Sequence, residues 1–126
     1  MHKSRLAGFI IDCQGDDLSE AAAFWSRALG YRIKPSENPE DDLYVLLDTG
    51  PDEMHIELQK VGHESRVHLD IEADDIEEEV RRLEKLGARR VAQVKTWWVL
   101  EAPSGHRFCV VKPQRADFHE EANRWE

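Results

Sequence analysis

The sequence has little of several features that define common protein classes. Of its 126 residues only two are cysteines, Cys13 and Cys109, and each lies within a short apolar run. Two cysteines are too few for a disulfide framework, and a free thiol in such a run behaves as a small hydrophobic residue. No apolar run approaches the roughly 20 residues of a membrane-spanning helix, and the run at residues 6–11 ends at Asp12. We therefore predict a cytoplasmic protein with no membrane partner.

Basic residues are also scarce. The chain has 26 acidic and 17 basic residues, for a formal net charge of −9, and no stripe of lysine or arginine. This charge repels phosphate backbones, so nucleic acid is excluded as a partner. The seven glycines are scattered at predicted turns and helix ends. They form no phosphate-binding loop, dinucleotide fingerprint or nucleophile elbow, which argues against nucleotide binding and covalent acyl transfer.

The first half of the sequence predicts one strand, one helix and three further strands. Residues 9–13 are rich in β-branched and aromatic side chains, which is typical of a buried strand. Asp17, followed by Glu20, has the spacing of a helix-capping box, and Gly30 supplies a helix end. Three short strand-like runs follow, at residues 31–34, 43–48 and 54–60.

The second half repeats this order. Residues 67–71 predict a strand, and Asp75, followed by Glu78, predicts the start of a helix that ends at Gly87. Three strand-like runs then occupy residues 88–94, 97–101 and 107–112. The two cap aspartates are 58 residues apart, and the two glycines that end the helices are 57 apart. Agreement in register at several positions indicates an internal duplication.

Length and repeat together predict the domain organisation. A chain of this size is typical of one domain, so we expect a single α+β domain over residues 1–126. Its tandem βαβββ copies occupy residues 6–62 and 66–113. Residues 114–126 are expected to form a helical tail, because Phe118, Ala122 and Trp125 recur at helical spacing.

This pattern resembles the vicinal oxygen chelate superfamily, which includes glyoxalase I, bleomycin-resistance proteins and extradiol dioxygenases. The resemblance covers residues 6–113 and rests on the tandem copies and on short motifs, namely Asp-Leu or Asp-Ile at each helix start, Leu-Gly at each helix end and a late Pro-x-Gly hairpin. The segments AFW, VHLDI, LEKLGA and PSGHRFCVV are most similar to its glyoxalase-like small-protein branch. The resemblance implies a curled mixed sheet with a central cleft between the copies, and a ligand or metal on the concave side.

Alternation along the strands sorts the residues that are expected to line this cleft. His68 and Asp70 share one face of their strand, and Val67, Leu69 and Ile71 share the face expected to pack on a helix. In the first copy the same alternation turns Asp12 toward the cleft and Phe9, Ile11 and Cys13 toward the helix. Trp97 and Trp98 point to opposite faces, so one of them is expected to form an apolar wall. The predicted ligand-binding residues are Asp12, Glu57, His68, Asp70, Trp97 and Trp98.

The metal-dependent relatives imply a second use of these residues. They take one ligand from the first and last strand of each copy, usually histidine or glutamate. His68 and Glu57 match two of these positions, Ile10 (or Gly8) stands at the third and cannot coordinate, and Cys109 replaces a glutamate at the fourth. The resemblance therefore implies an incomplete site of Glu57, His68 and Cys109, with zinc as the ion such a set would take. Without the resemblance, His68 is a strand histidine hydrogen-bonded to a neighbour.

Three functions remain open from the sequence. The first is a glyoxalase-like protein that binds a small organic molecule, and the acidic composition favours a cationic one. The second is a metal-dependent lyase, isomerase or dioxygenase in which Glu57 or Asp70 moves a proton. The third is a non-catalytic partner module, and since relatives often pair, we expect a homodimer. The incomplete ligand set favours the first, with no firm cofactor.

Overall fold

The computed structural model describes residues 1–35 and 43–126. It divides into two compact units, a larger one of residues 1–8 and 68–126 and a smaller one of residues 9–67. The fold is α+β, as predicted, and each half of the sequence contributes a strand, a helix and further strands in that order. The first copy consists of β1 (His2–Gln14), α1 (Ser19–Leu29), β2 (Tyr44–Leu47) and β3 (His55–Val61). The second consists of β4 (Arg66–Ala73), α2 (Ile76–Lys85), β5 (Arg89–Val94), β6 (Trp97–Glu101) and β7 (Arg107–Val111).

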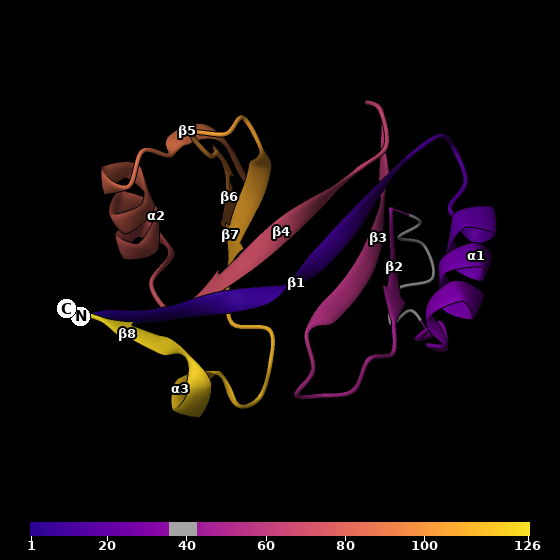
Figure 1. Ribbon diagram of the computed structural model, residues 1–126, viewed down its shortest axis with the longest axis horizontal. Coiled ribbons are helices and arrows are strands. Elements are labelled where there is room, and N and C mark those ends of the chain that lie inside the picture. The colour runs from indigo at the N-terminus through magenta and orange to yellow at the C-terminus, as the bar shows by residue number, and fades with distance from the viewer. Residues whose placement is uncertain (36–42) are drawn as a thin grey trace. The chain divides into compact units, whose positions relative to one another are not determined.

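The strands of the larger unit pair in the order β4, β7, β6, β5. The β4 and β7 strands run parallel, while the β7–β6 and β6–β5 pairs are antiparallel. Helix α2 lies beside β5, β6 and β7 (Figure 1). Its buried Val80 and Leu83 pack on Leu100 of β6 and Val110 of β7. This apolar cluster fixes which face of the sheet is covered by a helix.

The ends of α2 follow the local sequence closely. The Asp75 side chain accepts a hydrogen bond from the Glu78 backbone N–H at 3.1 Å, so the predicted cap is confirmed. Gly87 has φ 112°, a left-handed conformation that favours glycine. A Cβ at this position would also lie 3.0 Å from the Pro103 ring, a tight contact that adds to the backbone's preference for glycine.

The C-terminal segment contains a strand that the helical spacing did not predict. Helix α3 covers only Phe118–Glu121, and Asn123–Trp125 forms β8. This strand pairs antiparallel with the start of β1, with His2 opposite Trp125. The expected strand at residues 9–13 is correspondingly longer, because β1 begins at His2. Because this strand pairs with residues at the other end of the sequence, the pattern of neighbouring residues does not predict it.

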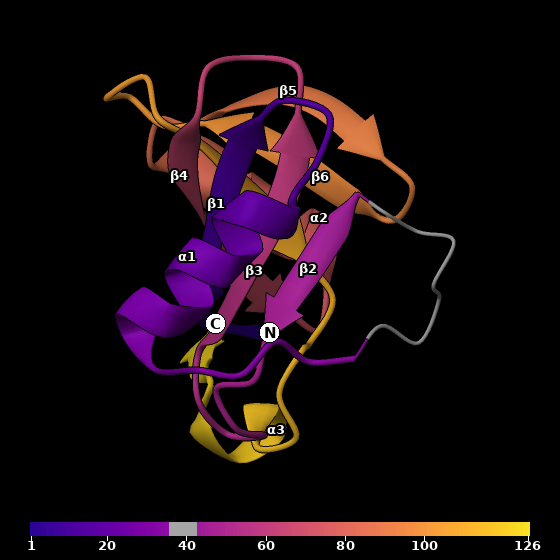
Figure 2. The same ribbon diagram turned by 90° about the vertical axis from the view of Figure 1, so that its right-hand side faces the viewer.

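The smaller unit has one helix over its own strands. The β2 and β3 strands pair antiparallel, and α1 lies beside them (Figure 2). Ala22 of α1 packs with Leu47 of β2 and Leu58 of β3 in a second apolar cluster. The predicted strand at residues 31–34 is reduced to a single bridge, in which Ile33 pairs with Leu47.

The two ends of α1 differ in how well the sequence predicted them. Gly30 ends the helix as expected, with φ 78°. The predicted capping box is wrong, because Leu18 is the N-cap residue and its side chain makes no capping hydrogen bond. Asp17 Oδ1 instead accepts the Ser19 backbone N–H at 2.8 Å, so Asp17 orders the turn before the helix.

Two of the side chains expected to pack on α2 lie outside the apolar cluster. Ile71 does pack against the cluster, whereas Val67 and Leu69 are 58% and 43% exposed. The cluster under α2 draws on the second half of β4, so the first half of this strand is left uncovered. In β1, likewise, Ile11 and Cys13 pack under α1 and Phe9 is exposed. Within the residues described, no helix has both the length and the apolar character needed to cross a membrane.

Candidate functional site

The sheet of the larger unit has one apolar face and one polar face. Ile71, Phe108, Val110, Trp98 and Leu100 belong to the cluster under α2. Because side chains alternate along a strand, the residues between them occupy the opposite face. That face carries His68, Asp70 and Glu72 from β4, Cys109 from β7 and Trp97 from β6.

Three of these side chains form one compact group. The parallel register of β4 and β7 places Asp70 opposite Cys109. One ligand atom each from His68, Asp70 and Cys109 lies within 4.8 Å of the other two. The His68 Nε2 atom is 3.5 Å from Asp70 Oδ1. The group therefore joins a nitrogen, an oxygen and a sulfur donor in a small volume, and we refer to it as the His68 group.

Asp70 is the residue of this group whose surroundings are unusual. Its side chain is 18% exposed, and its Oδ1 atom is buried without a hydrogen-bond partner among the residues described. The 3.5 Å distance to His68 Nε2 is too long for a normal hydrogen bond, so this contact does not satisfy the oxygen as an acceptor. Buried carboxylate oxygens in proteins nearly always accept hydrogen bonds, because water is no longer there to solvate them. Asp70 Oδ1 is thus an acceptor that a bound donor or cation would satisfy.

The His68 group is also the set of described residues best suited to a metal ion. Histidine nitrogen, carboxylate oxygen and thiolate sulfur are all zinc ligands, and the buried Asp70 oxygen can accept an ion. The sequence implied Glu57 in place of Asp70. Glu57 lies on β3, in the smaller unit, and no described metal-binding group includes it. Alternation on β4 could have suggested Asp70, since it shares a face with His68.

The two tryptophans of β6 take different roles. Trp98 packs against the cluster under α2, and the Arg90 guanidinium lies 4.9 Å from its ring centroid. Trp97 is on the polar face, opposite Val94 of β5 in the antiparallel register. Of the two aromatic side chains proposed for a ligand wall, the geometry therefore leaves Trp97 on the side of the His68 group.

Asp12 belongs to the smaller unit. It is only 3% exposed, and its Oδ2 atom is 3.9 Å from Arg66 Nε. The neighbouring Cys13 is half-buried, and burial, with the charge of Asp12, raises the pKa of its thiol. Cys13 thus stays protonated at neutral pH and acts as a packing residue.

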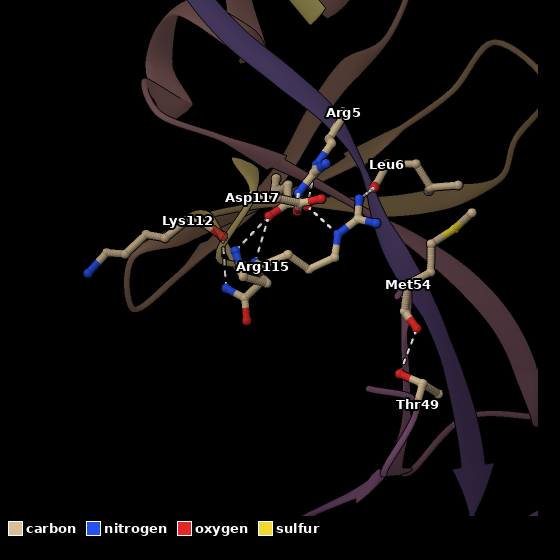
Figure 3. Close-up of polar contacts among 9 residues, drawn as sticks. Arg5, Leu6, Thr49, Met54, Lys112, Arg115 and Asp117 are labelled. Carbon is tan, nitrogen blue, oxygen red and sulfur yellow. Dashed lines mark hydrogen bonds and ion pairs between the residues drawn. The ribbon is translucent and has the colours of Figure 1, made fainter. Parts of the chain in front are cut away.

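Two buried glutamates of the larger unit were not singled out by the sequence. Glu72 is fully buried at the end of β4. Its Oε1 atom accepts the backbone N–H groups of Gln114 and Arg115, and its Oε2 atom accepts the Nε–H groups of Arg5 and Arg115. Figure 3 shows the side chains of Arg5, Arg115 and Asp117 close to one another. Burial alone would raise the pKa of Glu72, but these four donors outweigh it and lower the pKa.

Glu79 is the second buried glutamate, and it ties both ends of the chain to α2. Its carboxylate accepts hydrogen bonds from His2 Nε2 and Ser4 Oγ at 2.8 Å, and from both Nε and Nη2 of Arg82. Trp125 Nε1 donates to Ser4 Oγ, which adds β8 to the network. Burial opposes ionisation of Glu79, yet the hydrogen bonds, led by that of Arg82, lower its pKa.

A sequence signal for Glu79 did exist. Both glutamates stand in an acidic stretch around the start of α2, and acidic side chains at a helix start are usually exposed to solvent. Glu79, however, stands on the apolar stripe of α2, three residues after Ile76 and four before Leu83. A charge on such a stripe is buried, and buried charges need partners. These glutamates hold the fold and are not part of the His68 group.

Comparison with known proteins bears on this arrangement. The family model described as glyoxalase-like domain matches residues 8–111. No curated protein matches the chain. Among solved structures, methylmalonyl-CoA epimerase from Mycobacterium tuberculosis is similar at a TM-score of 0.61 and 18% identity, covering 86% of this chain and 89% of the other.

Two further structures show the same fold. A variant of Streptomyces coelicolor methylmalonyl-CoA epimerase, in complex with 2-nitronate-propionyl-CoA, has a TM-score of 0.62 at 15% identity, with coverage of 89% and 97%. A Legionella pneumophila structure described as NAD-dependent benzaldehyde dehydrogenase has a TM-score of 0.58 at 11% identity, with coverage of 81% and 96%. At these identities the likeness concerns the fold alone.

Proposed function

The chain belongs to the glyoxalase-like domain family, and on that premise we propose that it binds a small organic molecule on the polar face of β4, β7 and β6. The observation that carries the proposal is the buried Asp70 Oδ1 atom, which has no hydrogen-bond partner among the described residues. A ligand that donates an N–H or O–H group to this atom would replace the solvation lost on folding. The free cysteines agree with a cytoplasmic location.

The chemistry of the face favours a positively charged or amine-bearing ligand. An unsatisfied buried acceptor costs about 1–3 kcal/mol, and a bound donor recovers that free energy. The net charge of −9 attracts cations over the whole molecule. Trp97, on the same face, offers an aromatic ring, which attracts a cation within about 6 Å. Arg89 of β5 and Arg107 of β7 are both paired with Glu101 of β6.

A thermal-shift screen tests this function. Small amines and their neutral and anionic counterparts are compared on the wild-type chain and on Asp70→Asn. Asp52→Asn, which removes an exposed loop carboxylate, is the matched control. We expect amines to raise Tm in the wild type and the control but not in Asp70→Asn. The proposal would be contradicted if the amines raised the Tm of none of the three proteins, or raised it equally in all three.

A metal-dependent lyase or isomerase is the second candidate, and the compact His68 group favours it. His68, Asp70 and Cys109 would hold the ion, and a bound divalent ion supplies Lewis-acid polarisation of a substrate carbonyl. In this arrangement Cys109 would bind as a thiolate, beside a ring nitrogen of His68 and a carboxylate oxygen of Asp70. Two of the similar structures are described as methylmalonyl-CoA epimerase, which makes an epimerase-like proton transfer the reaction to test.

Metal analysis distinguishes the two candidates. Protein purified without chelator is assayed for zinc, and cobalt is then added to the apo-protein. The second candidate predicts about one ion per chain and a thiolate-to-cobalt absorption band that Cys109→Ser removes. Cys13→Ser is the matched control, because Cys13 lies outside the group. A content well below one ion per chain, with no cobalt band, would rule out the metal enzyme and leave the binding protein.

A further inference from the structure

The registers of the four strands arrange the polar face of the larger unit in rows. Asp70 of β4 lies opposite Cys109 of β7, Cys109 opposite Val99 of β6, and Val99 opposite Ala92 of β5. One row therefore crosses all four strands, and we call it the middle row. It is acidic at Asp70 and apolar at Val99 and Ala92. A molecule bound at Asp70 would thus have apolar surface beside it on the same face.

A second row, which we call the arginine row, lies next to the middle row. It consists of Arg107 of β7, Glu101 of β6 and Arg89 of β5, in register with one another. Arg107 and Cys109 are two residues apart on one strand, so they share a face and lie about 7 Å apart along it. Arg107 Nε is 3.1 Å from Glu101 Oε1, and Arg89 Nη2 is 2.7 Å from Glu101 Oε2. Because two guanidinium groups share one carboxylate, the arginine row carries an excess positive charge.

Arg107 is the member of the arginine row that can bind an anion. It contacts Glu101 through Nε, and its two Nη groups have no hydrogen-bond partner among residues 1–35 and 43–126. Its side chain is 36% exposed, so a ligand can reach these groups. Arg89, by contrast, is bound to Glu101 through both Nε and Nη2. Since two N–H groups of a guanidinium can bind one carboxylate in parallel, Arg107 presents a carboxylate-binding fork that Glu101 holds in place.

The separation of the two rows suits an α-amino acid. Asp70 Oδ1, in the middle row, is an acceptor without a donor among the described residues, and Arg107, in the arginine row, offers donors. With a hydrogen bond at each end, an α-amino acid spans about 8 Å from the acceptor of its ammonium group to the donor of its carboxylate. The rows are about 7 Å apart along the strands. The side chain of the amino acid would then lie along Val99 and Ala92.

The charges favour a carboxylate over a phosphate as the anionic group. One carboxylate neutralises the excess positive charge of the arginine row, whereas a phosphate dianion would add negative charge to a chain whose net charge is −9. A zwitterion has no net charge, so the acidic chain does not repel it. Its ammonium group also supplies the donor that Asp70 Oδ1 lacks.

We propose that the ligand is an α-amino acid with an apolar side chain. Its ammonium group donates to Asp70 Oδ1, and its carboxylate accepts from the Nη groups of Arg107. Its side chain packs on Val99 and Ala92 of the middle row. This ligand class rests on the proposed binding function and adds a carboxylate and a side chain to the amine. Because three groups of the ligand are held at once, the two enantiomers are distinguished.

Isothermal titration calorimetry of the full chain tests the proposal with leucine and with two molecules that each lack one of its charged groups. 3-Methylbutylamine lacks the carboxylate, and 4-methylpentanoate lacks the ammonium group. Leucine is expected to bind at least about tenfold more tightly than either, because each has lost hydrogen bonds to a charged partner. One enantiomer of leucine is expected to bind at least about tenfold more tightly than the other, since the other leaves a donor or an acceptor unpaired.

Arg107→Gln identifies the residue that binds the carboxylate. Glu101 keeps Arg89 in this variant, so its carboxylate still has a partner, and circular dichroism checks the fold. Leucine should bind Arg107→Gln at least about tenfold more weakly than the wild type, while the binding of 3-methylbutylamine is not weakened. Arg81→Gln is the matched control, because it removes an exposed arginine that also pairs with a glutamate, and it weakens neither ligand.

The amino acid proposal and the binding function on which it rests fail in different ways. If 3-methylbutylamine binds at least as tightly as leucine, or if leucine binds Arg107→Gln as tightly as the wild type, the amino acid proposal is overturned and amine binding at Asp70 stands. Equal binding of the two enantiomers also overturns it, because three groups are then not held. If 4-methylpentanoate binds at least as tightly as leucine, or if none of the three molecules binds, both are overturned.

Discussion

Replacing Glu72 by glutamine tests the claim that a buried carboxylate, and not apolar packing alone, holds the larger unit together. The substitution keeps the size of the side chain and removes its charge. One oxygen is retained and can still accept from the Gln114 and Arg115 backbone N–H groups. The other oxygen becomes an amide N–H₂ group, which is a donor. It would face the Nε–H donors of Arg5 and Arg115, at positions now 3.0 and 2.9 Å away.

The magnitude follows from these contacts. Each hydrogen bond to a charged group contributes about 1.5–3 kcal/mol, and Glu72→Gln removes two of them. It also leaves two buried guanidinium groups without their carboxylate, and breaking a buried ion pair in this way typically costs about 3–5 kcal/mol. Arg5 keeps part of its interaction through Asp117, at 2.6 Å, which holds the loss within that range. We expect a loss of about 3–5 kcal/mol in the free energy of unfolding.

Urea unfolding, followed by far-ultraviolet circular dichroism and tryptophan fluorescence, measures this loss. Because the free energy of unfolding falls by about 1–3 kcal/mol per molar urea, the urea concentration at the unfolding midpoint should fall by roughly 2 M. Glu78→Gln is the control, because Glu78 is exposed and its pair with Arg81 is worth at most about 1 kcal/mol. Equal losses in the two variants would refute the reasoning, since burial would then make no difference to the value of the carboxylate.

Three further predictions concern the carboxylates of the larger unit. Glu72 and Glu79 have folded-state pKa values below the ordinary 4.5, so their stabilisation is complete above that pH and is lost as pH falls through the folded values. The free energy of unfolding should therefore fall below about pH 4.5, and it should fall less steeply with pH when both residues are replaced by glutamine. An unchanged pH dependence in the double variant would contradict this prediction. Asp75→Ala should cost about 1 kcal/mol in urea unfolding by removing the α2 cap, and no loss would show that the cap is unimportant. Asp70→Asn should leave stability unchanged or raise it by about 1 kcal/mol, as removing the charge lowers the cost of burial; a large loss would mean that Asp70 has structural partners.

Features with local causes were predictable from the sequence. The Asp75 cap and the glycine at each helix end depend on a few neighbouring residues, and all appear where the sequence placed them. The order of strands within each copy also follows from short apolar runs between turn residues. The duplication supported the glycine at each helix end, whereas of the two predicted caps only that of Asp75 is present. For this reason the fold class was accessible without any structure.

Features that depend on residues far apart in the sequence were not predictable in this way. Strand β8 exists because Asn123–Trp125 finds the first residues of β1, a pairing between the two ends of the sequence. Glu72 and Glu79 are buried because arginines and serine from remote segments surround them. Asp70 was recognised as a residue of the polar face, but its place beside Cys109 depends on the register of two strands far apart in the chain. Alternation along a strand predicts which face of the sheet a side chain lies on, but it does not predict which residue of the neighbouring strand lies beside it.

The parallel pairing of β4 with β7 also sets when the His68 group can exist during folding. Helix α2 and strands β5 and β6 all lie between Asp70 and Cys109 in the sequence, and parallel strands can be joined only through such a crossover. Contacts of this long range form late, after the intervening segment is in place. A nascent chain that has not yet been synthesised as far as Cys109 would thus present no complete site. Ligand capture would consequently select finished molecules, and a bound ligand would protect them from unfolding in proportion to its concentration.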